Sequence, residues 1–258
     1  MIEIDYIELC NYVQREFKIN LNAYKELQMH RRIESFVSKT NAKTTIDFIR
    51  MCTVNDDLRE QFLDLITINV TEFFRNPDIF MQLREIFRRH LPKRDCYKIW
   101  SSACSNGSEP YSVAMILENM SITNYKILAT DIDQNVLNYA RNGIYKEDET
   151  LGVPDYYLLK YFNKVDDRYQ ISNSIKNKIT FSRHDLLLEN FPESLDLILC
   201  RNVVIYFKKE EKMKIYNKFY KSLNDNGIVF IGATENIYDH KQIGFTKLGT
   251  FFYQKVVK

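Results

Sequence analysis

The residues best suited to chemistry lie at the end of an apolar stretch and in the turn that precedes it. Asp131 follows the apolar segment Tyr125 to Thr130 and comes 24 residues after Gly107. An acid about 20 residues beyond the first turn of an α/β sheet commonly accepts hydrogen bonds from a ribose diol. Asp131 could instead cap the next helix, but Asp133 is better placed for that task. We therefore expect Asp131 to bind a ribose.

The turn before Asp131 indicates which kind of nucleoside would bind there. It reads Ser-Ala-Cys-Ser-Asn-Gly-Ser-Glu-Pro over residues 102–110. A turn that binds a pyrophosphate needs several glycines so that the backbone can approach the phosphates, and a P-loop needs a lysine. This turn has one glycine, Gly107, and no lysine. The composition favours a nucleoside without phosphates, of which S-adenosylmethionine is the common one.

The segments around this turn predict a parallel sheet covered by helices on both faces. Short apolar runs, typical of buried strands, alternate with segments that have helical spacing. Such a sheet binds ligands at the carboxyl ends of its strands, near the point where the strand order reverses. The expected strands are residues 99–100, 125–130, 179–181, 195–200 and 228–231, the expected helices are 109–120, 136–143 and 209–223, and a hairpin is expected over 245–257.

The first hundred residues contain no glycine, which suits helices joined by polar turns. Apolar residues at helical spacing predict helices in the segments 6–17, 21–37 and 58–69, with a short one around Phe48. A further helix starts at Asn76-Pro77, with Asn76 as its N-cap and proline at the first helical position, and Pro92 marks its end. We therefore expect a helical N-terminal domain over residues 1–92 and a second domain over residues 93–258.

Composition excludes several classes of function. The 36 basic and 34 acidic side chains leave a net charge of +2, too even for a protein that coats nucleic acid or an anionic membrane. No apolar run approaches the roughly 20 residues that a bilayer span needs, and the first residues do not resemble a signal peptide. Five cysteines without a CxxC pair indicate reduced thiols, and no cluster has metal-ligand spacing. We expect a cytoplasmic protein without a metal, a nucleic-acid partner or direct membrane insertion.

Four stretches carry a more specific signal. They are Ile68 to Arg75 (INVTEFFR), Ile99 to Ser112 (IWSSACSNGSEPYS), Ala129 to Tyr145 (ATDIDQNVLNYARNGIY) and Leu199 to Phe207 (LCRNVVIYF). In this order they resemble the chemotaxis receptor methyltransferases of the CheR type, and the resemblance covers nearly the whole chain.

The resemblance implies a fold, a reaction and a partner. The fold is α/β: a small all-helical N-terminal domain, then a doubly wound S-adenosylmethionine-dependent methyltransferase domain with an antiparallel β-subdomain inserted at residues 155–178. The reaction moves a methyl group from S-adenosylmethionine to glutamate side chains of chemoreceptors, giving glutamyl methyl esters and S-adenosylhomocysteine. The partner is the cytoplasmic helical bundle of methyl-accepting chemoreceptors, and we expect the enzyme to be a monomer.

The resemblance also implies roles for particular residues. Arg75 and Tyr206 are the candidate catalytic residues, and Tyr206 would line the reaction centre. Asp185-Leu186 stands beside the adenine where the family usually has Asn-Leu, so the polar contact at Asp185 is a departure from the pattern. The candidate cofactor-binding residues are Asn69, Thr71, Arg75, Gly107, Glu109, Asp131, Asp185, Leu186, Arg201 and Asn202.

The residues alone leave other interpretations open. Glu109 could simply favour a helix N-terminus, Asn69 could cap a helix, and Tyr206 could be a core aromatic residue. The chain could also methylate another acceptor, such as a small acid or a nucleic acid, or it could sense a nucleoside without turnover. Arg75 and Tyr206 argue against a sensor, because a sensor needs only cofactor contacts.

Two features concern the encounter with substrate. His30, Arg31 and Arg32 form a basic cluster that composition alone assigns to a solvated helix face, whereas the resemblance implies that Arg31 and Arg32 dock the receptor. Some members of the family capture a pentapeptide at the receptor C-terminus on the β-subdomain, next to a glycine-rich turn. Residues 163–168 of this chain contain no glycine and include Asp166-Asp167. We therefore expect an enzyme that does not use such a tether.

Overall fold

The computed structural model describes residues 4–256, so the last residues of the expected hairpin, from Val257 on, lie outside it. The chain divides into two compact units. The first comprises the residues up to Asn69 together with Tyr206–Lys212, and the second comprises Val70–Ile205 and Met213–Lys258.

The first unit is helical, as the missing glycines and the helical spacing predict. A buried cluster of phenylalanines forms its centre, in which the rings of Phe48 and Phe62 meet edge to face with centroids 5.0 Å apart. Side chains of Asp5, Thr44 and Asn55 cap three of the helices at their N-termini. The elements are α1 (Tyr6–Phe17), η1 (Leu21–Ala23), α2 (Glu26–Val37), α3 (Thr45–Val54) and α4 (Asp56–Thr67).

A later segment of the chain joins this helical unit. After η3 (Val204–Tyr206), the backbone N–H of Lys25 donates to the carbonyl of Tyr206 at 2.8 Å, and that of Lys208 donates to the carbonyl of Ala23 at 2.9 Å. The ring of Phe207 meets the ring of Tyr24 with centroids 5.0 Å apart. Tyr206 therefore belongs with α2 although it is more than 160 residues away in the sequence.

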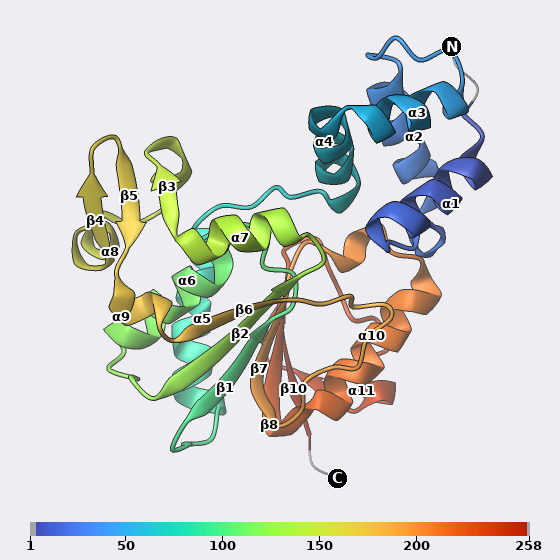
Figure 1. Ribbon diagram of the computed structural model, residues 1–258. Coiled ribbons are helices and arrows are strands. Elements are labelled where there is room, and N and C mark those ends of the chain that lie inside the picture. Colours follow the sequence, from blue (N-terminus) through green and yellow to red (C-terminus); the bar gives the residue numbers. More distant parts are fainter. Residues whose placement is uncertain (1–3, 257–258) are drawn as a thin grey trace. The chain divides into compact units, whose positions relative to one another are not determined.

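The second unit contains the predicted doubly wound sheet (Figure 1). Its strand order is β6-β2-β1-β7-β8-β10-β9, in which the first five strands are parallel and β10 is antiparallel to both of its neighbours. The order reverses between β1 and β7, which is where such sheets bind ligands. The strands are β1 (Tyr97–Ser101), β2 (Tyr125–Asp131), β6 (Ile179–Arg183), β7 (Leu195–Cys200), β8 (Leu223–Ile231), β9 (Phe245–Lys247) and β10 (Phe252–Lys255).

Helices cover both faces of this sheet. On one face lie α5 (Pro77–His90), α6 (Ser108–Asn119) and α7 (Gln134–Asn142), and on the other lies α10 (Lys209–Ser222), followed by the short α11 (His240–Ile243) (Figure 1). Phe80 of α5 meets Phe230 of β8 at 5.9 Å between ring centroids, and Phe219 of α10 meets Trp100 of β1 at 5.7 Å.

The helix α5 belongs to the second unit, which corrects the predicted domain boundary at residue 92. Its apolar side Phe80, Leu83 and Phe87 is buried in the same core as β1 and β8. Pro92 ends the helix as predicted, but a proline marks only where a helix stops and does not show which core the helix joins. By contacts the units divide after Asn69.

An insertion between α7 and β6 forms the predicted small antiparallel sheet, with strand order β3-β5-β4. It begins earlier than residue 155, because β3 pairs with β5, and a short helix ends it before β6 begins. Its elements are β3 (Ile144–Lys146), η2 (Asp148–Thr150), α8 (Asp155–Tyr161), β4 (Phe162–Val165), β5 (Arg168–Ile171) and α9 (Asn173–Lys176).

Candidate active site

The carboxyl ends of β1, β2 and β7 bring three predicted site residues to one edge of the sheet. Glu109 lies in the first turn of α6 after β1, Asp131 ends β2, and Arg201 follows β7. All three are buried, with 7%, 8% and 6% of their surface exposed. Charged side chains are seldom this buried unless they are paired, so their partners define the site.

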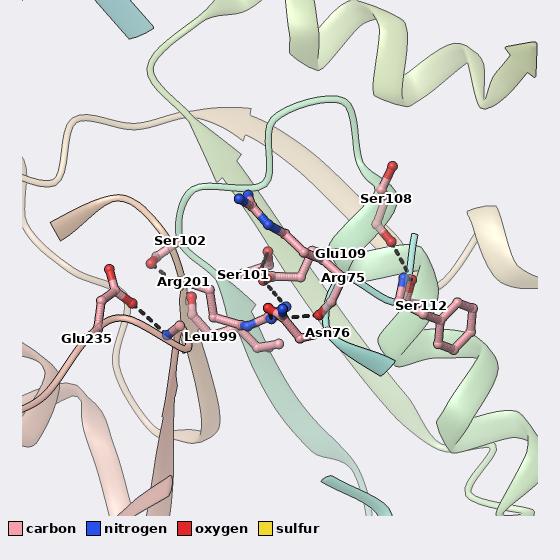
Figure 2. Close-up of polar contacts among 12 residues, drawn as sticks. Arg75, Asn76, Ser101, Ser102, Ser108, Glu109, Ser112, Leu199, Arg201 and Glu235 are labelled. Carbon is pink, nitrogen blue, oxygen red and sulfur yellow. Dashed lines mark hydrogen bonds and ion pairs between the residues drawn. The ribbon is translucent and has the colours of Figure 1, made fainter. Parts of the chain in front are cut away.

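Glu109 and Arg201 form a buried ion pair, shown in Figure 2. Arg201 Nη1 lies 3.5 Å from Glu109 Oε2, and the hydroxyl of Ser101 donates to Glu109 Oε1 at 2.7 Å. Burial raises the pKa of the Glu109 carboxyl, whereas the charge of Arg201 and the Ser101 hydrogen bond act to lower it. Burial likewise lowers the pKa of Arg201, and the carboxylate opposes that effect. The pair thus places a buried anionic side chain beside a buried cationic one.

The Arg201 guanidinium is held from several directions. Its Cζ lies 4.9 Å from the centre of the Phe80 ring and 4.8 Å from that of Phe230. Its Nη2 donates to the carbonyl of Arg75 at 2.7 Å and to Asn76 Oδ1 at 3.1 Å. Asn76 begins α5 as predicted, but its side chain makes no capping hydrogen bond and accepts from Arg201 instead.

The segment before α5 has an unusual backbone. Phe74 and Asn76 have φ of 51° and 63°, a conformation that L-residues adopt sparingly and that clusters at functional sites. Between them, Arg75 turns back so that its Nη1 donates to the carbonyl of Val70 at 2.8 Å. The charge of Arg75 also acts to lower the Glu109 pKa. Thr71 is half-buried in the same segment.

Asp131 accepts hydrogen bonds from two turns at once. Its carboxylate oxygens accept from the backbone N–H of Ser105 at 2.8 Å and of Asp133 at 3.1 Å. Asp133 caps α7 through Asn135 N–H, which confirms the prediction that Asp133 is the cap. Burial raises the pKa of Asp131 to about 6, although these N–H groups favour the ionised form. Each carboxylate oxygen retains a further acceptor site, as a ribose-binding acid requires.

Gly107 and Asn202 have structural reasons for their places. Gly107 has φ of 87°, and a Cβ there would come within 2.9 Å of the Ala140 Cβ, so the turn before α6 requires glycine for its own packing. Asn202 has φ of 59°, and its backbone closely faces Gly232, where a Cβ would lie 2.9 Å from Asn202 N. Both flank the site at the ends of β1 and β7.

Asp185 closes a turn after β6. It is buried, and its Oδ1 accepts from the backbone N–H of Leu187 at 2.7 Å and of Leu188 at 3.3 Å. Asparagine can form the same Asx-type turn, so this local structure does not depend on the departure from Asn. Leu186, beside it, is buried as well.

The remaining predicted residues belong to the first unit. The Asn69 side chain donates to Asp64 Oδ1 at 3.3 Å. Tyr206 lines a hollow of about 330 Å³ together with Arg31 and Arg32, and Tyr24, Lys25, Gln28, Met29 and Ile68 complete its lining. Arg32 also donates to the carbonyl of Leu65 at 3.2 Å, near the end of α4, so only part of its hydrogen-bonding capacity faces the hollow.

Sequence reasoning missed the residues that support the Glu109–Arg201 pair: Ser101, Asn76, Phe80 and Phe230. Ser101 stands directly at the end of a predicted strand, beside the turn, and this position was a usable signal. Nothing in the local sequence indicates that Phe80 and Phe230, 150 residues apart, enclose the same guanidinium.

The residues present fit S-adenosylmethionine. Its amino-acid part carries an amino group and a carboxylate, which match the buried Glu109 and Arg201, and its ribose matches Asp131. Among the described residues the buried Arg201 Nε has no hydrogen-bond partner, and a ligand acceptor would remove the cost of leaving it unpaired.

Within residues 4–256 no three histidine, cysteine or acidic side chains are grouped to hold a metal ion. No described helix is long and apolar enough to cross a membrane.

Comparisons with known proteins agree with this assignment. A family model described as "CheR methyltransferase, SAM binding domain" matches residues 69–252, and one described as "CheR methyltransferase, all-alpha domain" matches residues 4–67. The chain is 38% identical to the chemotaxis protein methyltransferase of Listeria monocytogenes, with 98% of each chain covered. It is 35% identical to that of Borreliella burgdorferi, with 94% and 92% covered, and 34% identical to that of Escherichia coli, with 75% and 70% covered. The cofactor of this protein is S-adenosylmethionine.

We predict that Asp131→Asn weakens binding of S-adenosylhomocysteine about 10- to 100-fold, because hydrogen bonds to a charged acceptor contribute roughly 1.5–3 kcal/mol. Isothermal titration calorimetry at pH 8 measures this. Asp133→Asn is the matched control, because asparagine also caps helices well, and it should bind as the wild type does. Unchanged affinity in Asp131→Asn would remove Asp131 from the cofactor site.

We also predict that cofactor affinity depends on pH through Asp131. Because its pKa is raised to about 6, the carboxylate is ionised at pH 7 and largely protonated at pH 5. A protonated carboxyl accepts poorly, so the dissociation constant of S-adenosylhomocysteine should rise about tenfold between pH 7 and pH 5. The slope should flatten in Asp131→Asn. An equal slope in the variant would assign the titration to another group, Glu109 first.

Proposed function

The chain belongs to the family of CheR chemotaxis protein methyltransferases, and we propose that it transfers a methyl group from S-adenosylmethionine to glutamate side chains of chemoreceptors, giving glutamyl methyl esters and S-adenosylhomocysteine. The observation that carries this proposal is the buried Glu109–Arg201 pair beside Asp131, at the carboxyl edge of the sheet and within the matched cofactor-binding domain. The relatives named above are chemotaxis proteins, which favours a receptor as the acceptor.

The chemistry fits a site without a nucleophile–base pair. When bound, S-adenosylmethionine supplies a methyl group on a positively charged sulfur that leaves as a neutral thioether. A glutamate acceptor, with a solution pKa of about 4.3, is already ionised at neutral pH and needs no general base. The protein therefore has to align the acceptor carboxylate and exclude water from it.

We assign these tasks to two residues. Arg75 retains donors beyond the one directed at Val70, and it would hold the acceptor carboxylate through charge-assisted hydrogen bonds. The Tyr206 hydroxyl would orient the same carboxylate. The proposed cofactor contacts are those of Asn69, Thr71, Gly107, Glu109, Asp131, Asp185, Leu186, Arg201 and Asn202.

The partner would be the cytoplasmic helical bundle of a methyl-accepting receptor, met in the cytoplasm by a monomeric enzyme. Arg31 and Arg32 line a hollow in the first unit together with Tyr206, and both are exposed. Carboxylates near the acceptor glutamate would be attracted to this basic lining.

One experiment tests the proposal directly. The protein is incubated with S-adenosylmethionine labelled in its methyl group and with a receptor cytoplasmic fragment, a mixture of small carboxylic acids, or duplex DNA. We expect label on the receptor fragment alone, released as methanol by mild base as a methyl ester requires. Label on a small acid or on DNA would establish a different acceptor, and binding without turnover would establish a sensor.

We predict that Arg31→Glu raises the receptor Michaelis constant more at low salt than at high salt, since exposed charges are screened beyond about 10 Å at 0.1 M ionic strength. Arg31 is chosen over Arg32 because Arg32 also bonds to the end of α4. Arg50→Glu, an exposed change of equal charge on α3, is the control and should have a small effect. An equal loss at both salt concentrations would contradict electrostatic docking.

We further predict that the enzyme does not need a C-terminal receptor tether. In the insertion, β4 and β5 are joined by Asp166-Asp167, and Asp166 already has φ of 55°. These carboxylates would repel an acidic peptide, and no glycine opens the turn for a closely approaching strand. A receptor-tail pentapeptide should show no saturable binding by calorimetry, and deleting the tail should leave the methylation rate unchanged. Micromolar binding would overturn this expectation.

A further inference from the structure

Three elements of the insertion pack against the segment that carries Arg75. The ring of Phe73 meets Tyr145 of β3 edge to face, with centroids 4.8 Å apart, and meets Phe162 of β4 at 5.5 Å. The next residue, Phe74, stacks on Tyr157 of α8 at 5.1 Å with the two planes 21° apart. Both phenylalanines are almost completely buried. Two consecutive side chains just before Arg75 are thus fixed by three elements of the insertion.

A backbone contact adds to these rings. A Cβ built on Gly152, between η2 and α8, would lie only 2.4 Å from the carbonyl oxygen of Phe73. Gly152 is not among the glycines with a positive φ, so a left-handed backbone is not the reason for glycine there. Glycine is required there because two backbone segments of the chain approach so closely.

Only one or two residues separate Phe73, which the insertion contacts, from the residues that bond to Arg201. The backbone N–H of Phe74 donates to Ser112 Oγ on α6 at 2.9 Å, and Arg75 and Asn76 then provide the two acceptors of Arg201 Nη2 (Figure 2). Because Phe74 and Asn76 both have left-handed backbones, this tightly bent path offers little freedom to absorb a shift at Phe73. Tyr145 also donates to the carbonyl of Asn106 at 2.7 Å, in the turn after β1.

We propose that the insertion has a positioning function in catalysis: Gly152, Tyr145 and Tyr157 hold Phe73 and Phe74, and thereby set Arg75 at the acceptor and its carbonyl against Arg201. The inference rests on the catalytic role proposed for Arg75. A misplacement of about 1 Å far from the reacting atoms is enough to slow an enzyme strongly. Nothing bound to the insertion is needed for this function.

The alternative is that Gly152, Tyr145 and Tyr157 contribute only to the packing and stability of the core. A core residue that acts through stability alone changes the melting temperature and leaves the turnover of the folded enzyme unchanged. A positioning residue lowers kcat in enzyme that is folded, and it loosens the segment 70–76 itself. The two roles can therefore be separated by measurement.

The first test compares Gly152→Ala with Gly249→Ala in the full chain. At Gly249 a Cβ would meet only Phe252, at 3.9 Å, an ordinary contact. In Gly152→Ala we expect kcat for the receptor fragment to fall about tenfold or more, with its Michaelis constant within about twofold. Hydrogen exchange read by mass spectrometry should quicken in peptides spanning residues 70–76. Gly249→Ala should change neither quantity, and equal behaviour of the two variants would overturn the proposal.

A second pair of variants tests the proposal even if Gly152→Ala disrupts the fold. Tyr157→Phe keeps the ring on Phe74 and should retain wild-type kcat and exchange, whereas Tyr157→Ala should reproduce the loss of kcat and the faster exchange at 70–76. If Tyr157→Ala lowers only the melting temperature, the tyrosine is merely structural and the proposal fails. A wild-type enzyme that labels no receptor fragment would instead refute the proposed function, and the two failures are thus distinct.

Discussion

The buried pair of Glu109 and Arg201 is the interaction around which the second unit is arranged. Removing two charges from water is costly, and such a pair is tolerated only when further hydrogen bonds and good geometry compensate for the lost hydration. Here Ser101 supplies a hydroxyl, Phe80 and Phe230 supply aromatic faces, and the start of α5 supplies two oxygen acceptors. The pair therefore ties together β1, α6, β7, β8 and the segment that precedes α5.

This arrangement explains why α5 belongs with the sheet although it precedes the first strand in the chain. Asn76, directly before the helix, accepts from Arg201, and Phe80 one turn later packs against the same guanidinium. Loss of these contacts would leave part of a buried guanidinium without hydrogen-bond partners, which is far more costly than the loss of an exposed ion pair. The pair also suits the site to an amino-acid ligand, because the carboxylate of Glu109 can face an amino group and the guanidinium of Arg201 can face a carboxylate.

Much of the site could be predicted from the sequence because its residues lie at positions of fixed meaning. Asp131 ends an apolar strand, Asp133 follows at a capping position, and Glu109 opens a helix after the turn that holds Gly107; the structure places all of them as expected. Predictions failed where the outcome depends on distant contacts. Asn76 was expected to cap its helix, but a guanidinium 125 positions later takes its side chain.

The sequence by itself determined most strands and helices of the sheet domain and the cofactor class, because apolar periodicity and turn composition are local properties of the chain. Only the tertiary structure decided which core each element joins. It placed α5 with the sheet and Tyr206 with the helices of the first unit, and it packed Phe73 and Phe74 against the insertion. The physical reason is that packing energy depends on shape and burial between residues far apart in the chain, which no local pattern encodes.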